Sequence, residues 1–126
     1  MIKFQIIVPT QNSYKILGKL IKSIKSQTYK NWSVIFIDGK SNKSHVRFLK
    51  ELTSKDKRFI YLKQKNKYKG IFGAMNQGLE VKEKNSWILF WGSDDWANGV
   101  DTFDQLNKYL IKLSHLNLDL IFCKGK

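Results

Sequence analysis

Cysteine, proline and long apolar segments are scarce in this 126-residue sequence, which has one cysteine and one proline. The single cysteine, Cys123, cannot form a disulfide within the chain, and with two distant histidines it is too little for a zinc site. The longest apolar run, residues 87–91, is far shorter than the roughly 18 residues that a membrane span needs. Polar Gln11 and Asn12 follow the first apolar stretch too early for a secretory signal. We therefore expect a cytoplasmic chain.

Acidic residues and arginine are also scarce. The sequence has 10 acidic residues against 23 Lys and Arg, which gives a formal net charge of +13, and only Arg47 and Arg58 are arginines. A charge of this sign favours polyanionic partners such as nucleic acid, anionic lipid or phosphorylated ligands. Dedicated nucleic-acid sites, however, rely on the bidentate guanidinium group of arginine. The composition therefore favours a lysine-coated, solvated surface, and a dedicated polyanion site stays open as the alternative.

Short apolar strands alternate with amphipathic helices along the chain, and 42% hydrophobic residues are enough for one domain with one core. The helices are predicted after a cap at Asn12 or Ser13, at residues 44–53 and 71–81, and after a cap at Asp101 or Thr102. Strands are predicted at residues 4–8, 32–37, 59–62, 86–91 and 119–123. This alternation indicates an α/β fold, with a mostly parallel sheet and helices on both of its faces.

Polar residues follow three of the predicted strands, at residues 9–12, 38–41 and 93–95. Right-handed crossovers place the carboxyl ends of parallel strands along one edge of the sheet. Open α/β sheets bind their ligands at that edge. We therefore expect these three segments to form one ligand site.

Asp94 and Asp95 are adjacent carboxylates directly after an apolar strand. Such a pair is costly to hold together unless a cation neutralises it, and oxygen ligands of this kind suit Mg²⁺ or Mn²⁺. The alternative is a solvated turn without a metal ion. Trp96 follows the pair and could stack on a sugar or a base.

The first two segments offer polar groups that suit a nucleotide. Asp38 could accept a hydrogen bond from a ribose hydroxyl or a base, although aspartate is also favoured as the first residue of a turn. Thr10 and Asn12 are interpreted first as caps of the following helix. They could instead present a hydroxyl and an amide to a ligand at the helix N-terminus.

The third predicted helix contains two glycines and a polar residue that its packing does not explain. Because glycine costs about 1 kcal/mol in a helix, Gly73 and Gly78 indicate a close approach of the backbone to a neighbour. Asn76 lies between them and favours a functional role. His45 and His115 are interpreted as surface residues of their helices, without a role in the site.

Two common nucleotide-binding motifs are missing from the sequence. Residues 9–14 read PTQNSY after the first strand, so the G-x-G-x-x-G fingerprint of dinucleotide-binding domains is absent there. No strand is followed by a P-loop either. The sequence therefore disfavours both of these classes.

Five segments resemble, in order and spacing, the family 2 glycosyltransferases of the GT-A fold. They are IIVPTQN at residues 6–12, SQTYKN at 26–31, IDGKSN at 37–42, KGIFGAMNQG at 69–78 and WILFWGSDD at 87–95. The last two are similar to a subgroup that builds surface polysaccharides. The resemblance implies a Rossmann-like GT-A fold and transfer of a sugar in surface polysaccharide or lipopolysaccharide synthesis.

The resemblance also implies roles for single residues. The donor would be a UDP- or GDP-sugar, and the acceptor a sugar or a lipid-linked sugar. A Mg²⁺ or Mn²⁺ ion at Asp94 and Asp95 would bridge the donor diphosphate, and an acceptor hydroxyl would attack with inversion of configuration, which requires a general base. The residues implied to bind the substrate are Pro9, Thr10, Asn12, Asp38, Gly70, Asn76, Ser93 and Asp94.

The sequence departs from the family pattern at several positions and in its length. Gly92 stands where many members have the first Asp of D-x-D, Lys40 replaces a glycine of the turn, and Gly73 replaces an Asp. Family members have roughly another 100 residues in an acceptor half, so residues 1–126 are interpreted as one truncated, donor-binding domain. A homo-oligomer or a second chain could supply the missing half.

Two other functions remain open at this stage. One is a non-catalytic module of the same fold that binds a nucleotide or a partner chain. The other is a lysine-rich nucleic-acid-binding domain, although no element for specific base readout is evident. The expected location is the cytoplasm, either free or peripheral at the inner face of the membrane.

Overall fold

The computed structural model describes residues 1–121, which form alternating strands and helices as the sequence predicts. A short 3-10 helix at Ser114–Leu116 follows the last α-helix. The other elements, in chain order, are β1 (Lys3–Thr10), α1 (Tyr14–Lys25), β2 (Trp32–Asp38), α2 (Lys43–Lys55), β3 (Phe59–Lys63), α3 (Gly70–Val81), β4 (Ser86–Phe90) and α4 (Thr102–Lys112).

The four strands form one parallel sheet in the order β3-β2-β1-β4. Strand β1 pairs along both edges, so that Ile7 lies opposite Ile35 of β2 and Phe90 of β4. Every residue of β2 is buried. Strands buried on both faces are nearly continuous apolar runs, which is why β1 and β2 lack polar alternation although Gln5 and Ser33 are buried in them.

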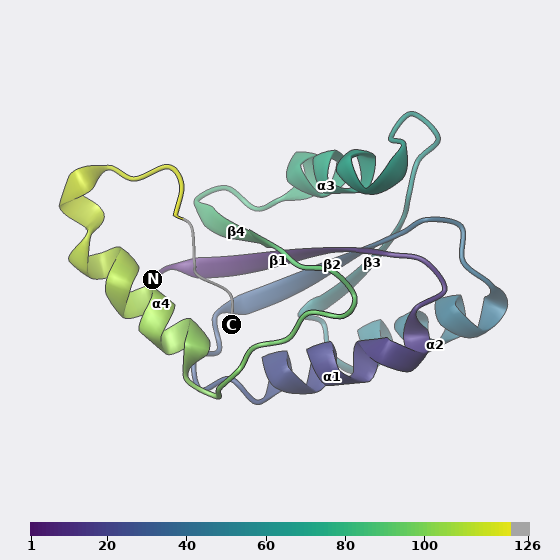
Figure 1. The fold of residues 1–126 in the computed structure, drawn as a ribbon, viewed down its shortest axis with the longest axis horizontal. Helices are drawn as coiled ribbons and strands as arrows, with labels where there is room; N and C mark the ends of the chain where they lie inside the picture. The colour runs from purple at the N-terminus through teal and green to yellow at the C-terminus, as the bar shows by residue number, and fades with distance from the viewer. Residues whose placement is uncertain (122–126) are drawn as a thin grey trace.

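Helices cover both faces of the sheet (Figure 1), which confirms the predicted α/β fold. One face carries α1, α2 and α4, and its core joins Phe4, Ile6 and Val8 of β1 to apolar residues of these helices. The opposite face carries α3 alone, and its smaller core joins Ile7 to Ala74. The alternation of side chains along β1 therefore divides the core into two layers.

Glycines lie where helix α3 contacts strand β1 and the loop that precedes the helix. A Cβ atom built on Gly78 would lie 2.6 Å from Cγ2 of Ile7, and one built on Gly73 would lie 2.6 Å from the carbonyl carbon of Tyr68. Both distances are shorter than van der Waals contact. The close approach that these two glycines predict is confirmed.

Buried Gln27 anchors the segment that follows α1 to the start of α4. Its side-chain amide donates to the carbonyl oxygens of Ser23, at 3.0 Å, and Gly99, at 2.6 Å. Its side-chain oxygen accepts from the N–H of Phe103 at 3.0 Å. The following Tyr29 donates from its hydroxyl to the carbonyl oxygen of Ile2. Gln27 and Tyr29 therefore hold the SQTYKN segment against the start of α4 and against Ile2.

The predicted strand at residues 119–123 is wrong over residues 119–121, which are irregular. Asn117 adopts a left-handed conformation (φ 49°) after the 3-10 helix, and Leu120 is exposed, whereas Ile121 is half-buried and packs against the larger core without strand pairing. Residues 122 and 123, including Cys123, lie outside the described residues. None of the helices described is long and apolar enough to cross a membrane.

The glycine contact predicts opposite effects of one substitution at two helical positions. Gly78→Ala should lower the free energy of unfolding, because overpacking against Ile7 costs about 1–3 kcal/mol. That cost outweighs the gain of about 1 kcal/mol from helix propensity. Gly18→Ala on α1 is the matched control, because its Cβ would meet nothing within 4 Å, and it should raise stability. Urea unfolding measures both, and a Gly78→Ala variant at least as stable as the wild type would contradict the packing.

Candidate functional site

The loops after β1 and β2 meet at the edge where the strands end, and backbone contacts hold them together. The N–H of Gly39 donates to the carbonyl oxygen of Thr10 at 2.9 Å. Asn12 links the same two loops, because its N–H donates to Ser41 Oγ at 2.8 Å and its Oδ1 accepts from the N–H of Asn42 at 2.7 Å. The two loops therefore form one rigid unit.

An open pocket of about 670 Å³ lies at this edge, and we call it the edge pocket. Residues at or after the ends of β1, β2, β3 and β4 line it. The predicted meeting of the segments after β1, β2 and β4 is confirmed in part, because Asn12, Asp38, Asp94 and Asp95 are not among the lining residues. Its lining residues are Pro9, Thr10, Gln11, Gly39, Lys40, Gln64, Lys65, Asn66, Lys69, Gly70, Ile71, Ala74 and Ser93.

Asp38 is buried at the end of β2, with 1% of its surface exposed, and is not among the lining residues. Its carboxylate accepts hydrogen bonds from the hydroxyls of Tyr61, at 2.7 Å, and Ser41. Burial, together with the hydrogen bond to this carboxylate, raises the pKa of the Tyr61 hydroxyl. Both carboxylate oxygens of Asp38 thus have a partner within the protein.

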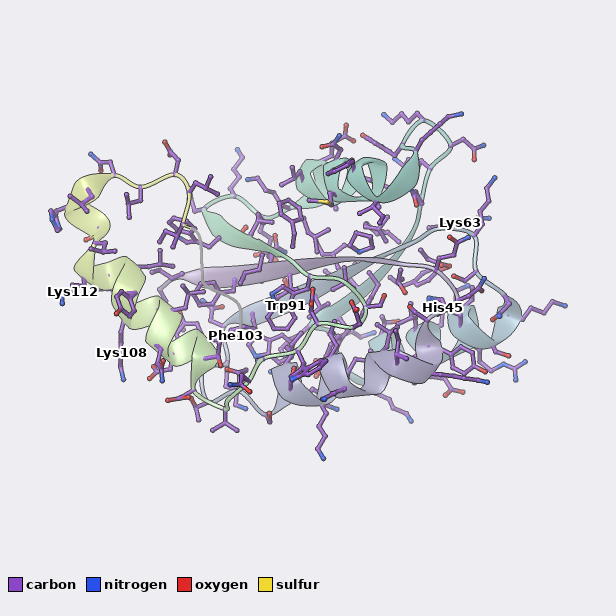
Figure 2. All side chains as sticks on the ribbon, viewed as in Figure 1. His45, Lys63, Trp91, Phe103, Lys108 and Lys112 are labelled. Carbon is purple, nitrogen blue, oxygen red and sulfur yellow. The ribbon has the colours of Figure 1, made fainter. Side chains whose placement is uncertain are left out.

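His45 is fully buried beside Asp38, and its prediction as a surface residue is wrong (Figure 2). Its Nδ1 accepts the N–H of Ser13 at 3.1 Å, which leaves the ring proton on Nε2. Nε2 lies 3.3 Å from Thr10 Oγ1 and 3.7 Å from Asp38 Oδ1. Burial lowers the pKa of His45, against the opposing attraction of Asp38. The signal for burial was the helical spacing of His45 with Leu49, which are the two buried residues of α2.

A chain of hydroxyls continues from His45 to the loop after β4. Thr10 Oγ1 hydrogen-bonds Ser13 Oγ, which donates to Ser93 Oγ at 2.9 Å. Ser93 in turn donates to the carbonyl oxygen of Pro9 at 3.3 Å. Through these contacts the loops after β1 and β4 hold each other at the edge pocket.

The interpretation of Thr10 and Asn12 as helix caps is wrong. Ser13 occupies the cap position of α1, and its side chain makes no capping hydrogen bond. Asn12 has a left-handed backbone (φ 50°), which turns its amide toward the loop after β2 instead of the helix. Asparagine tolerates this conformation better than most residues, which is a local reason for its presence there.

Asp94 and Asp95 lie in a second hollow, which we call the Asp94 groove. Its lining residues are Lys15, Ile16, Lys19, Leu20, Asp94, Asp95 and Trp96. Both residues are exposed, and the carboxylate of Asp95 accepts the N–H of Gly92 at 2.6 Å. The Nζ atom of Lys19 lies 3.5 Å from the centre of the Trp96 ring. Lys19 therefore occupies one face of the ring that the sequence suggests for stacking on a sugar or a base.

The Asp94 groove fits a cation only in part. Within residues 1–121 no cluster of three or more His, Cys, Asp or Glu side chains could hold a metal ion. Mg²⁺ and Mn²⁺ sites, however, commonly use one or two carboxylates and complete their coordination with substrate phosphates and water. The exposed carboxylate of Asp94 suits that type of site.

The two residues predicted from the KGIFGAMNQG segment separate in the structure. Gly70 lines the edge pocket with a left-handed backbone (φ 67°), whereas Asn76 is exposed and outside the lining. The buried polar residue of this helix is Gln77, which the sequence analysis missed. Its Oε1 accepts the N–H of Lys65 at 2.9 Å, and its Nε2 donates to the carbonyl oxygen of Lys63 at 3.0 Å.

The fold and the site define an α/β domain with an open pocket at the carboxyl edge of a parallel sheet. Known proteins then place it within one family. The sequence profile described as "Glycosyl transferase family 2" matches residues 5–113. The chain belongs to this family, and its fold is the GT-A fold.

One curated relative and two solved structures illustrate this membership. The chain is 33% identical to the GalNAc(5)-diNAcBac-PP-undecaprenol beta-1,3-glucosyltransferase of Campylobacter jejuni, over 75% of the chain and 30% of that protein. It resembles S. aureus TarS 1-349 in complex with UDP-GlcNAc with a TM-score of 0.78 and 23% identity, over 90% and 32% of the two chains. It resembles the mannosyltransferase PcManGT from Pyrobaculum calidifontis, in complex with GDP-Man and Mn²⁺, with a TM-score of 0.74 and 18% identity, over 86% and 32%.

Each match covers a minor part of the other protein. The chain spans 15% to 45% of the length of the curated relatives that it matches. The family profile covers every residue that lines the edge pocket, and strands β2, β3 and β4 in full.

Because His45 is buried, we predict that the protein loses stability as the pH falls from neutral to acidic values. Because burial lowers the pKa of folded His45 below the ordinary value of 6.5, the unfolded chain binds more protons between the two values. Its contribution to stability should be complete above pH 6.5 and lost as the pH falls through the lowered pKa. Urea unfolding of the wild type and His45→Gln between about pH 5 and 8 measures this.

Exposed His115 is present in both the wild type and His45→Gln, so a difference in slope between the two proteins reports on His45. The free energy of unfolding should depend more steeply on pH in the wild type than in His45→Gln. Equal slopes in the two proteins would contradict the assignment of the lowered pKa to His45.

Proposed function

We propose that this chain binds a nucleoside diphosphate sugar in the edge pocket and forms the donor half of a glycosyltransferase. The observation that carries this proposal is the place of the pocket in the sheet. The strand order β3-β2-β1-β4 reverses direction at β1, and residues after β1 and β4 line the pocket. Open α/β sheets bind nucleotides at such a reversal.

Several predicted residues are suitably placed for this role. Pro9, Thr10, Gly70 and Ser93 line the pocket and would contact the nucleotide. Asp38 lies just beneath, where a shift of Ser41 would free its carboxylate for a base or ribose group. Asn12 is assigned to holding the loops of the pocket together instead of contacting the nucleotide. Asn76 is exposed outside the pocket lining and is assigned no contact with the nucleotide.

Asp94, with Asp95 beside it, is the proposed binding point for Mg²⁺ or Mn²⁺. The ion would offset negative charge on the diphosphate as the nucleotide leaves. Ser93 brings the two hollows together, because it lines the edge pocket and directly precedes Asp94. The structure solved with GDP-Man and Mn²⁺ shows that this fold accommodates a donor and a metal ion together.

We infer that the complete enzyme transfers the sugar with inversion, by attack of an acceptor hydroxyl on the donor. A general base must then lie within about 3 Å of the hydroxyl proton. A sugar or lipid-linked acceptor in surface polysaccharide synthesis is the proposed substrate. The name of the Campylobacter jejuni relative, which includes an undecaprenol-linked acceptor, supports it.

Nucleotide binding should depend on both the metal ion and Asp94. We expect UDP or GDP to bind more tightly with Mn²⁺ than with EDTA, and Asp94→Asn to weaken the Mn²⁺-dependent part by about tenfold or more. Asp119→Asn is the matched control, because it removes an exposed carboxylate far along the chain from the site. Calorimetry measures the dissociation constants, and binding that neither the ion nor Asp94→Asn affects would remove Asp94 from the site.

The 126-residue chain should bind the donor but transfer its sugar slowly. The carboxylates that follow Asp95 are engaged or distant, because Asp101 accepts from Gln105 at 2.6 Å and Asp104 pairs with Lys108 at 2.7 Å. We expect slow donor hydrolysis and little transfer, since no acid of residues 1–121 lines the pocket. Labelled donors with free and lipid-linked acceptors test this, and rapid transfer by a demonstrated monomer would contradict it.

A further inference from the structure

Lysine is the charged residue of the edge pocket. Lys40 reaches it from the loop after β2, and Lys65 and Lys69 reach it from the loop between β3 and α3. Among residues 1–121, no Asp or Glu lines the pocket, and none of these three lysines is in an ion pair. The pocket therefore carries uncompensated positive charge.

The loop that carries two of these lysines is anchored on both sides. Gln77 holds the backbone at Lys65 and Lys63 through its two hydrogen bonds. The side-chain amide of Gln64 donates to the carbonyl oxygens of Tyr68 and Gly70, each at 2.9 Å. Buried or half-buried glutamines thus fix the backbone from which Lys65 and Lys69 extend.

Lys40 is held in an unfavourable backbone conformation at the pocket. Its φ is 61°, in the left-handed region that lysine rarely adopts. The hydrogen bonds of Gly39 to Thr10 and of Asn12 to Ser41 fix the chain on either side of it. Glycine would adopt this conformation more easily, so the side chain of Lys40 needs a separate reason, and the pocket supplies one.

The carboxylates that suit a metal ion lie elsewhere. Asp94 and Asp95 line the Asp94 groove, where Lys15 and Lys19 are the neighbouring charges. The site therefore has two separate means of offsetting phosphate charge, one through lysines in the pocket and one through a cation in the groove. Lysine is a common phosphate ligand because its ammonium group acts as a mobile point charge.

We propose that Lys40, Lys65 and Lys69 bind the diphosphate of the donor directly, so that part of the affinity for the nucleotide requires no metal ion. The inference rests on the proposed function, because it assigns the donor to the edge pocket. It adds that the charge of the pocket selects a ligand with two or more phosphate charges. Uridine, which has none, should gain nothing from these lysines.

The test is calorimetry on the 126-residue chain in EDTA, with UDP, inorganic pyrophosphate and uridine as ligands. We expect UDP and pyrophosphate to bind without metal, with an affinity that falls as salt is raised from about 0.05 to 0.5 M, because exposed ion pairs are screened. Each single Lys→Gln substitution should weaken binding about threefold, and the triple variant about tenfold or more. Asp119→Asn, which changes an exposed carboxylate outside the pocket lining, should leave binding in EDTA unchanged.

The matched control is Lys112→Gln, which makes the same change of charge in the last turn of α4. Figure 2 shows Lys112 at the opposite end of the molecule from Lys63, the last residue of β3, which precedes the loop that carries Lys65 and Lys69. This control should bind UDP and pyrophosphate as the wild type does. Equal losses in Lys112→Gln and in the pocket variants would reduce the effect to net charge and overturn the proposal.

The outcomes separate this inference from the proposed function. Binding of UDP with Mn²⁺ but of no phosphate ligand in EDTA would overturn the lysine site and leave the donor proposal standing. Suppose instead that pyrophosphate binds in EDTA, that the pocket lysines affect this binding, and that no nucleotide binds. That result would support the lysine site and overturn the donor proposal. A triple variant that binds like the wild type would also overturn the lysine site, and thermal unfolding of each variant confirms that it is folded.

Discussion

Strand β1 is hydrogen-bonded along both edges and buried on both faces, and the geometry of the site depends on it. Its register sets Thr10 opposite Asp38 at the end of β2. From that point, contacts of Thr10 and Ser13 extend to His45 on one side and to Ser93 on the other. A shift of β1 by one residue would turn every one of its side chains to the opposite face, so the two cores also fix the site.

Buried polar groups beneath the pocket complete this arrangement. Asp38, His45 and Tyr61 are satisfied by one another and by neighbouring hydroxyls, so they are held without a ligand. Buried polar networks of this kind rigidify a structure when every member has a partner. The pocket is open, and its lining includes Lys40, Lys65 and Lys69. The edge of the sheet thus combines a buried, hydrogen-bonded polar network with a pocket that lysines line.

The net charge of +13 acquires a more specific meaning in this arrangement. Most lysines cover the surface, as the composition favours, but three line the edge pocket. A count of charges gives no information on where they gather, because Lys40 and Lys65 are 25 positions apart and meet only through the pairing of β2 with β3. The polyanion that the composition left open is, in our proposal, a nucleotide.

The sequence by itself determined the α/β class, four of the strands, all four helices and the meeting of the loops at one edge. Apolar strands and amphipathic helices are local patterns, and parallel topology brings the strand ends together. Only the tertiary structure decided which residues face the pocket, since that depends on contacts between distant segments. It buried His45 through its contacts with Asp38 and Thr10, turned Asn12 from the helix to a loop, and exposed Asn76. It also left residues 119–121 outside the sheet, since Leu120 is exposed and Ile121 packs against the larger core without pairing to a strand.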